Sequence, residues 1–296
     1  MKNVLLWGMS ELYDKYRNQF IKEELKNNIN IIGVMLTEDC IYERIDKYPV
    51  YNIEQLSTAQ VDYIITFAPD EIYSDMRKII RLLKWDDDRL INGNVFFLPQ
   101  FDFSLYLRVK ESKVSIITNQ CWGGYTYHSL DMKFYSPFIN LFMNNEDYLK
   151  LMNDFNWYME QPLVYLKELY EINLKRNYPV AQLGDITLHM NHYLNFEEAL
   201  TAWNKRKNRI NYNNLLFVMR IDELQEAKVF AESSPKYKIG FSNKPYPFEN
   251  IIYLPPRDDC EFYVQVNSCA DSNILSLKPY NVLKLLLHKK DYMRLN

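Results

Sequence analysis

The segment Asn3–Tyr13, NVLLWGMSELY, decides the fold of the first part of the chain. A short apolar run leads to Gly8, and Ser10 then stands where the N-cap of a helix is expected. Similar strands are predicted at Ile31–Leu36 and Val61–Ala68, and a helix follows the second of these. Continuously apolar strands that alternate with helices indicate a parallel, doubly wound α/β sheet with right-handed crossovers.

A domain boundary is predicted in the charged stretch Tyr106–Lys113. It follows the last predicted strand of the first domain, Val95–Leu98, and precedes a new strand at Val114–Thr118. A chain of 296 residues has room for two ordinary domains. We therefore expect a Rossmann-like domain at residues 1–108 and a second, larger α/β domain at residues 109–296.

The pattern of the second domain predicts further strands and helices. Residues 178–193, YPVAQLGDITLHMNHY, alternate as strands do. Asn195, followed by Glu198, forms a capping-box pattern for a helix to about Arg209. The other predicted helices are near Asn145–Met159 and Pro162–Ile172, at Glu223–Ser233 and from Pro279 to about Tyr292, and the other strands are Leu215–Met219 and Ile251–Leu254.

Composition excludes several classes of protein. Apolar residues make up 48% of the chain and charged residues 25%, which is typical of a globular protein. A net charge of −3 gives no electrostatic reason to bind nucleic acid. We expect no signal peptide and no transmembrane segment, because no apolar run is long enough. The four cysteines, Cys40, Cys121, Cys260 and Cys269, show no metal-binding spacing, so we expect free thiols in the cytoplasm.

The first candidate site lies at Gly8, Ser10 and Asp39. A strand, a glycine and a helix start form the geometry that receives a phosphate, and Asp39 follows the second strand, where a ribose-binding carboxylate would stand. The motif is GMSELY, which lacks two of the glycines of a dinucleotide fingerprint. The same loop also occurs in doubly wound domains that bind no nucleotide.

The second candidate site is the stretch NQCWGG, in which a chain with only seven glycines places two side by side. Cys121 would stand at the carboxyl end of a strand, where open α/β sheets bind ligands. A thiol at a helix N-terminus has a lowered pKa and acts as a nucleophile. Asn119 and the backbone amides of Trp122, Gly123 and Gly124 would form a ligand loop or oxyanion hole. The alternative is a buried structural thiol beside a tight turn.

The third candidate site contains Asp185, His189 and His192. On a helix these residues would share one face and could bind a metal ion. The alternation of apolar residues favours a strand, which separates the two histidines, so we predict no metal site. We expect His189 to transfer protons for Cys121, with Asp185 orienting its ring. A hydrogen-bonded structural histidine is the alternative.

The fourth candidate is the basic end of the helix that contains Lys205–Arg209. Arg206 and Arg209 are three residues apart and can face the same way, so they could bind a phosphate of a nucleotide-sugar or of coenzyme A. Basic residues at a helix C-terminus are also favoured by the helix dipole alone.

The chain also resembles two groups of bacterial proteins. NVLLWG, IIGVM, Tyr48-Pro49-Val50 and VDYIITFA resemble the N-terminal domain of bacterial sugar acyltransferases, which holds a nucleotide-sugar. Residues 114–215 resemble a bacterial family often labelled exopolysaccharide-biosynthesis proteins, through NQCWGG, SPFINLFMNNEDYLKL, YPVAQLGDITLHMNHY and AWNKRKNRIN. A more distant likeness is to capsule-biosynthesis acetyltransferases that bind coenzyme A and carry an Asn-Cys pair, which Gln120 interrupts here. These resemblances imply a role in surface-polysaccharide assembly.

The resulting hypothesis is a cytoplasmic transferase that moves an acyl group, with a coenzyme A ester as a candidate donor, to a glycan or nucleotide-sugar. Cys121 would be the nucleophile or would lie next to the transferred group. The alternative is a non-catalytic protein of the same pathway that binds sugar or nucleotide through its aromatic side chains, Trp122, Tyr125, Tyr127 and Trp203. A glycosyltransferase is less favoured, because no DxD-like motif follows a strand.

Overall fold

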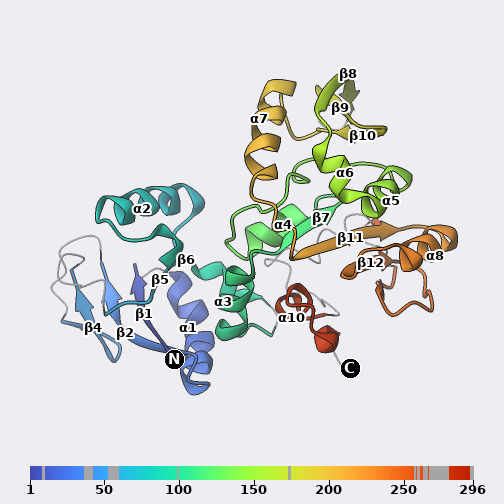
Figure 1. The fold of residues 1–296 in the computed structure, drawn as a ribbon. Coiled ribbons are helices and arrows are strands. Elements are labelled where there is room, and N and C mark those ends of the chain that lie inside the picture. The colour runs from blue at the N-terminus through green and yellow to red at the C-terminus, as the bar shows by residue number, and fades with distance from the viewer. Residues whose placement is uncertain are drawn as a thin grey trace. The chain divides into compact units, whose positions relative to one another are not determined.

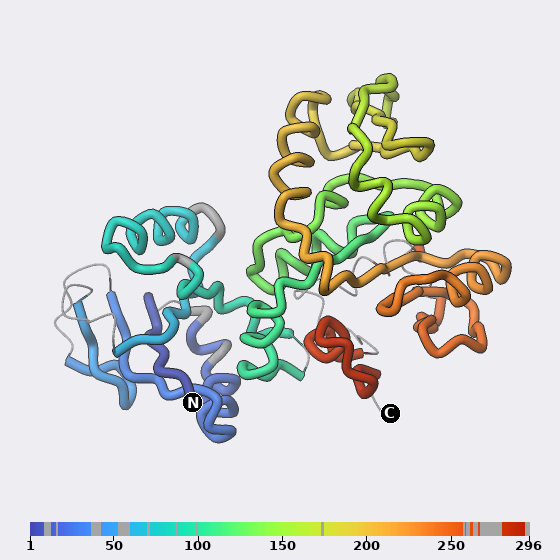
Figure 2. The backbone as a smooth tube through the Cα atoms, in the orientation of Figure 1, coloured from blue at the N-terminus to red at the C-terminus, as the bar shows by residue number. Residues whose placement is uncertain are grey.

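The computed structural model describes residues 1–8, 11–36, 43–52, 60–98, 100–172, 175–256, 258, 261–262, 266 and 280–293. The chain divides into two compact units, Met1–Leu107 and Arg108–Asn296, and the boundary falls inside helix α3 (Phe103–Ser112). Both units combine strands and helices (Figure 1), so the predicted α/β class is confirmed, and Figure 2 traces the path of the chain through them. Among the helices of the described residues, none combines the length and apolarity that a bilayer-spanning segment needs.

Unit 1 contains a six-stranded sheet in the order β3-β4-β2-β1-β5-β6. All neighbouring strands are parallel except β3 and β4. The strand order reverses between β1 and β5, which is the switch point of a Rossmann-like domain, so the predicted parallel sheet is confirmed. The elements are β1 (Lys2–Trp7), α1 (Glu11–Leu25), β2 (Ile29–Met35), β3 (Arg44–Ile45), β4 (Tyr48–Tyr51), β5 (Tyr63–Thr66), α2 (Asp70–Leu82), η2 (Asp87–Arg89), β6 (Leu90–Asn92) and η3 (Gly93–Phe97).

The predicted strand Val95–Leu98 is wrong, because these residues follow the strand β6 and belong largely to the 3₁₀ helix η3. The side chain of Asn92 accepts a hydrogen bond from the backbone N–H of Asn94 at 3.0 Å, which turns the chain into the helix. Phe96 is buried against Phe20, with ring centroids 4.8 Å apart. This short apolar run therefore packs into the core as a helix. A short buried helix and a short buried strand cannot be distinguished by their apolar composition alone.

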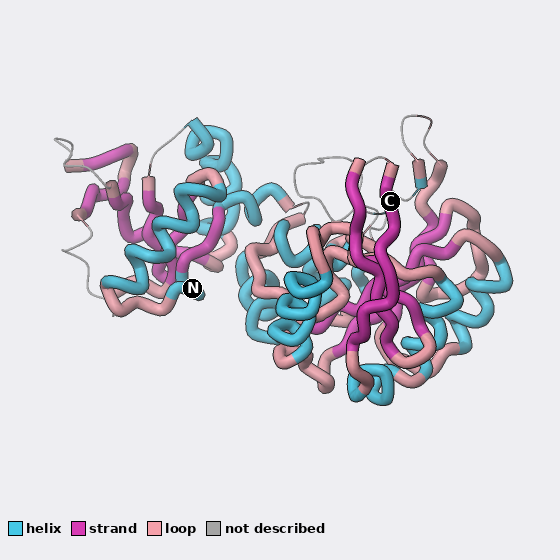
Figure 3. Tube along the Cα trace, turned by 90° about the horizontal axis from the view of Figure 1, so that it is seen from above, coloured by secondary structure: helices cyan, strands magenta, loops and turns pink. Residues whose placement is uncertain are grey.

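Unit 2 contains two sheets (Figure 3). A four-stranded parallel sheet has the order β13-β12-β11-β7, and a three-stranded antiparallel sheet has the order β10-β9-β8. The elements are β7 (Ser115–Thr118), α4 (Trp122–Ser129), α5 (Asn145–Asn153), α6 (Phe155–Glu160), β8 (Leu163–Glu171), β9 (Arg176–Leu183), β10 (Ile186–His189), α7 (Phe196–Lys207), β11 (Leu215–Ile221), α8 (Leu224–Glu232), β12 (Lys238–Ser242), β13 (Ile251–Tyr253), α10 (Val282–Leu286) and η4 (Lys290–Tyr292).

The predicted helix Pro162–Ile172 is wrong, since Leu163–Glu171 form the strand β8. The apolar residues Leu163, Leu166 and Leu169 are three apart, which resembles a helical stripe. Antiparallel pairing with β9 along the whole strand overrides this local pattern. The predicted helix Asn145–Met159 is also interrupted, because Asp154 leaves helical geometry (φ −136°, ψ 48°) between α5 and α6.

Two buried tyrosines fix the strand β7. Tyr148 donates a hydrogen bond to the carbonyl O of Ile117 at 2.6 Å and accepts one from the N–H of Val218 at 2.9 Å, which ties β7 to β11. Tyr127 on α4 donates to the carbonyl O of Val114 at 2.7 Å and accepts from the N–H of Ile116 at 2.9 Å. These bonds satisfy backbone groups that an edge strand would otherwise leave unpaired, and they hold the residues that follow β7 in place.

Candidate active site

The candidate site lies at the carboxyl edge of the parallel sheet of unit 2. Since β7, β11, β12 and β13 are parallel, their carboxyl ends meet at one edge. Residues 119–121 follow β7 there, and residues 222–223 follow β11. Ligands of open parallel sheets bind at this edge. The strand placement predicted for Cys121 is therefore confirmed.

The glycine pair does not form a turn. Gly123 and Gly124 lie in the first turn of α4, and neither has a positive φ. A Cβ on Gly123 would come within 2.9 Å of Thr118 Cγ2 and 3.2 Å of Ile116 Cγ2, whereas one on Gly124 would meet only Ile139 Cγ2, at 3.5 Å. Gly123 thus allows α4 to pack closely on β7, and this packing places Cys121 at the N-cap of the helix.

The structure brings His192, and not His189, to Cys121. The Sγ of Cys121 lies 3.7 Å from Nε2 of His192. Cys121 is partly buried and His192 is exposed, so the pair is open to a substrate. His192 lies in the segment between β10 and α7, where a hydrogen bond from the N–H of Tyr193 to the carbonyl O of Met190 turns the chain. The strand ends at His189, and the turn beyond it carries His192 back to the thiol.

His189 and Asp185 make other contacts, so the predicted Cys121–His189–Asp185 arrangement is not assembled. The ring of His189 stacks on Phe142, with centroids 4.4 Å apart, and its Nδ1 lies 3.1 Å from the hydroxyl of Tyr178. Asp185 accepts a hydrogen bond from Tyr158 at 2.6 Å and pairs with Lys150 at 3.3 Å, in the connection between β9 and β10. His189 fits the structural alternative that the sequence left open.

Metal binding has no support in the part of the chain that the structure describes. No group of three or more His, Cys, Asp or Glu side chains suited to hold a metal ion occurs among those residues.

The electrostatics of the pair differ from the prediction for an activated thiolate. Burial raises the pKa of the Cys121 thiol above its ordinary value, opposite to the lowering expected at a helix N-terminus. Partial desolvation of the ring, together with the positive charge of Arg176, lowers the pKa of His192. At neutral pH the thiol is therefore protonated and the imidazole is neutral. This is the state in which His192 can act as a general base for Cys121.

Arg176, which no sequence motif marks, completes the surroundings of the pair. It opens β9, and its Nη2 donates a hydrogen bond to the carbonyl O of Asn191 at 3.1 Å. The Nε of Arg176, the Oδ1 of Asn191 and both amide atoms of Gln120 are buried without a hydrogen-bond partner among the described residues. Gln120 and Asn191 directly precede Cys121 and His192 in the chain. Unpaired buried polar atoms are unfavourable in a core unless a water molecule, an ion or a ligand satisfies them.

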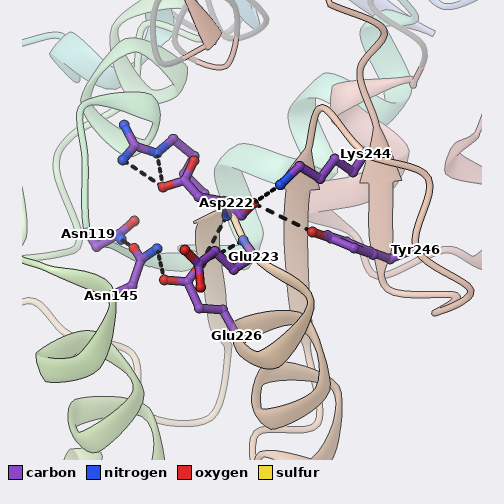
Figure 4. A network of polar contacts seen from close by, with 8 residues as sticks. Asn119, Asn145, Asp222, Glu223, Glu226, Lys244 and Tyr246 are labelled. Carbon is purple, nitrogen blue, oxygen red and sulfur yellow. Dashed lines mark hydrogen bonds and ion pairs between the residues drawn. The ribbon is translucent and has the colours of Figure 1, made fainter.

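A second polar network extends from Asn119 towards β11 (Figure 4). Asn119 is buried, and its Nδ2 donates to Oδ1 of Asn145 at 2.7 Å, while its own Oδ1 has no partner in the described part of the chain. The Nδ2 of Asn145 donates to Oε1 of Glu226 at 2.9 Å. Glu226 Oε2 accepts from the backbone N–H groups of Asp222 at 2.9 Å and Glu223 at 3.2 Å, which caps α8. Asn119 therefore ties the end of β7 to the start of α8.

The same network holds the end of β11. The side chain of Arg220 binds Oδ2 of Asp222 through Nε at 3.1 Å and Nη2 at 2.8 Å. Lys244, which follows β12, donates to the backbone carbonyl of Asp222 at 3.1 Å (Figure 4). These contacts make the loops after β7, β11 and β12 one connected frame beside Cys121.

Three of the four aromatic residues assigned to sugar stacking belong to the core. Trp122 is 0% exposed and donates a hydrogen bond from Nε1 to the hydroxyl of Tyr280 at 3.2 Å. Tyr127 is buried at β7, and Trp203 is buried against Phe138 at 5.2 Å between ring centroids. Tyr125 is 45% exposed. A stacking platform made of these four side chains is therefore not present.

The predicted phosphate-binding arginines make contacts within the protein. Arg206 donates to the hydroxyl of Tyr193 at 2.5 Å and lies over the ring of Phe134, 5.0 Å from its centroid. Arg209 donates to the backbone carbonyl of Phe134 at 3.3 Å. Both side chains hold the segment between α4 and α5, and phosphate binding by them remains a prediction.

The nucleotide site predicted in unit 1 is described only in part, because Ser10 and Asp39 lie outside the described residues. Gly8 has φ +85°, a conformation that favours glycine. Its backbone N–H donates to the carbonyl O of Met35 at 2.9 Å, so this amide is occupied by β2. Nucleotide binding at this loop remains a prediction.

A pocket of about 380 Å³ lies elsewhere in unit 2. It is lined by residues at the amino ends of β11 and β12, including Leu215 and Tyr237, and by the α5–α6 junction around Asp154. None of the residues near Cys121 lines it. Volume alone does not make it the reactive site, because it lies at the edge opposite to the Cys121–His192 pair.

Comparison with known proteins identifies families without a described activity. Residues 92–285 match the model of a domain of unknown function, DUF1919, and residues 1–91 match the model "C2185-like, N-terminal". An "Uncharacterized protein" of Haemophilus influenzae is 30% identical over 156 residues, which cover 51% of this chain and 72% of the relative.

A solved structure of aspartate semialdehyde dehydrogenase II complexed with ASA, from Vibrio cholerae, aligns with 11% identity and a TM-score of 0.25, over 74% of this chain and 68% of that one. At this TM-score the alignment supports no conclusion about fold or function. The match to residues 92–285 covers most of the chain, and the protein therefore belongs to the DUF1919 family.

Proposed function

We propose that the protein is an acyltransferase that uses the thiol of Cys121 as nucleophile and His192 as general base. The observation that carries the proposal is the 3.7 Å contact between Cys121 Sγ and His192 Nε2 at the N-terminus of α4. A protonated thiol beside a neutral imidazole can transfer its proton as it attacks, so no resting thiolate is required. The site also lies at the ligand-binding edge of a parallel sheet.

The reaction follows from the positions of these groups. His192 Nε2 accepts the thiol proton while Cys121 Sγ attacks the acyl carbonyl carbon of the donor. The first backbone N–H groups of α4, at Trp122 and Gly123, have no partner inside the helix and would stabilise the oxyanion. The intermediate collapses as the leaving group takes the proton from His192, which leaves a thioester on Cys121. An acceptor hydroxyl then gives its proton to His192, attacks the thioester and releases the thiol.

The identities of donor and acceptor belong to the proposal as well. A coenzyme A ester as donor and a glycan or nucleotide-sugar of a surface polysaccharide as acceptor rest on the sequence resemblances alone. A cytoplasmic location rests on the thiol, because a free cysteine nucleophile suits a reducing compartment.

The test is acylation by an activated ester, p-nitrophenyl acetate, followed by peptide mass spectrometry. The wild type should gain an acetyl group on Cys121, and Cys121→Ser should not gain it there. His192→Gln should slow acetylation about a hundredfold, at the lower end of general-base contributions. His189→Gln is the matched control and should retain the wild-type rate. Acetylation of Cys121 that is equally fast in His192→Gln and in the wild type would refute the assignment of the base.

A further inference from the structure

We infer that the Cys121 site takes a substrate carrying a carboxylate or phosphate group, and that Arg176 binds this anion. The inference deepens the proposed function and rests on it, since it takes Cys121 as the reacting group. It concerns an arginine that carries no recognisable motif, in addition to Arg206 and Arg209, whose side chains make contacts within the protein.

The guanidinium of Arg176 has few polar partners among the described residues. Arg176 forms no ion pair with a carboxylate among them, and its one hydrogen bond there goes to the carbonyl O of Asn191. Its side chain is partly buried, and its Nε is fully shielded from solvent. A guanidinium without a counter-ion in a partly buried site is unfavourable, and an anionic ligand removes this penalty.

Arg176 and Gln120 both carry buried polar atoms without partners among the described residues. Arg176 Nε offers a hydrogen-bond donor, and the amide of Gln120 offers a donor and an acceptor, all buried and without partners in the described part of the chain. The N–H groups of a guanidinium match the oxygens of a carboxylate or phosphate. Arg176 binds the backbone carbonyl of Asn191, the residue before His192, and Nε2 of His192 contacts the thiol, so we place the bound anion beside this pair.

Arg176 differs in this respect from the arginines of the helix α7 and its C-terminal end. Arg206 donates a hydrogen bond to the hydroxyl of Tyr193 and lies over the ring of Phe134, and Arg209 donates to the carbonyl O of Phe134. The Nε of Arg176 is a donor that the described residues leave unused. An unused donor on a side chain that binds the backbone of Asn191, one residue before His192, is suited to bind a substrate anion.

The experiment compares the alkylation of Cys121 by two probes of similar size, anionic iodoacetate and neutral iodoacetamide. The ratio of the two rates at Cys121 should exceed the ratio for the small thiol N-acetylcysteine. Arg176→Gln should lower the ratio about fivefold, as expected for loss of one charge interaction near the surface. Arg176→Lys should retain much of it, and Arg209→Gln, the matched control, should leave it unchanged. A structural role for Arg176 would change both rates together and leave the ratio constant.

Protection experiments distinguish the two sources of the anion. Coenzyme A, with its phosphates, or glucuronate, with its carboxylate, is added to the wild type during alkylation by iodoacetamide. Protection by coenzyme A that Arg176→Gln abolishes would place the anion on the donor, and protection by glucuronate that the same variant abolishes would place it on the acceptor.

Two results would overturn the inference: a rate ratio in the wild type equal to that of N-acetylcysteine, or a ratio unchanged in both Arg176→Gln and Arg176→Lys. Absence of protection by either compound also counts against it. These outcomes are separate from failure of the proposed function, because Cys121 can prefer iodoacetate without forming an acetyl-enzyme, and can form one without any preference.

Discussion

At the residue scale, the reactive features of Cys121 come from its neighbours. Its thiol is partly buried, which raises its pKa, and the contact with His192 offers a route for the proton. A thiol of this kind reacts slowly with simple alkylating agents unless a base assists. In the proposed mechanism the first N–H groups of α4, which have no partner inside the helix, stabilise the oxyanion, while burial still raises the pKa of the thiol.

This environment predicts the pH dependence of alkylation. The rate of reaction of Cys121 with iodoacetamide should rise along a titration whose midpoint lies above the ordinary thiol pKa of about 8.5, since burial disfavours the thiolate. Alkylation that is quenched at set times over a range of pH, followed by peptide mass spectrometry, measures this midpoint. A midpoint clearly below the ordinary value would show that the thiolate is stabilised and that burial does not control its pKa.

The sequence alone singled out Cys121 and predicted His189 as its partner, whereas the structure brings His192 to the thiol. His189 and His192 both lie in one short stretch, which was predicted to be mostly strand, but the strand ends at His189 and His192 lies in the turn beyond it. The turn after β10 determines which histidine contacts the thiol, and its sequence contains no glycine or proline from which the turn could be predicted. Arg176 was not singled out either, because it carries no motif of its own and its contact with Asn191 arises only in the folded chain.

At the element scale, the packing of α4 on β7 positions the thiol. The glycine pair was expected to form a turn, but only Gly123 is required by its surroundings, through its close approach to Thr118 and Ile116. Sequence patterns predicted most of the strands of the parallel sheet. They failed for β8, where an apolar spacing of three imitates a helix, and for η3, where an apolar run imitates a strand.

A matched pair of substitutions tests this packing. Gly123→Ala should lower the free energy of unfolding by about 1–3 kcal/mol, because the new methyl group would lie 2.9 Å from Thr118 Cγ2 and α4 would have to shift. Gly124→Ala meets only Ile139 Cγ2, at 3.5 Å, and should be neutral or stabilising by up to about 1 kcal/mol. Urea denaturation measures both. Equal effects of the two variants would contradict the packing role of Gly123.

At the scale of the whole molecule, the order of strands could be predicted only in part. Alternating apolar strands and helices indicated the α/β class and the parallel sheet of unit 1. The antiparallel sheet β8–β10 lies in the sequence between β7 and β11, and it was predicted only in part. The apolar spacing of β8 is typical of a helix, whereas that of its partner β9 is typical of a strand. The C-terminal segment likewise ends in two short helices, α10 and η4, where one longer helix was expected.

His288 predicts how the stability of this assembled structure depends on pH. Its ring stacks on Tyr237, with centroids 3.6 Å apart, and its Nε2 lies 2.7 Å from Asn214 Oδ1. Burial, with the charge of Lys236, lowers the pKa of His288 to about 4. An unfolded histidine titrates near about 6.5, so between these two values the unfolded state binds a proton that the folded state does not. The free energy of unfolding should therefore fall as the pH is lowered through this window, by at most about 3 kcal/mol from this residue.

The measurement compares the wild type with His288→Gln by urea denaturation at about pH 7 and about pH 4.5, which lie above and within this titration window. At the higher pH the free energy of unfolding of the wild type should exceed that of His288→Gln. At the lower pH this difference between the two proteins should shrink, because only the wild type loses the contribution of a neutral buried histidine. Other titrating groups are shared by both proteins and cancel in the difference. A difference that is the same at both pH values would show that His288 does not titrate as described.

The most direct test of the central claim, that His192 is the base for Cys121, is the pH profile of acetylation of Cys121 by p-nitrophenyl acetate. Desolvation and Arg176 lower the pKa of His192, so the wild-type rate should fall on the acid side with a midpoint below the ordinary histidine value of about 6.5. In His192→Gln this acid limb should be absent and the remaining rate should follow the thiol alone. The same acid limb in both proteins would contradict the claim.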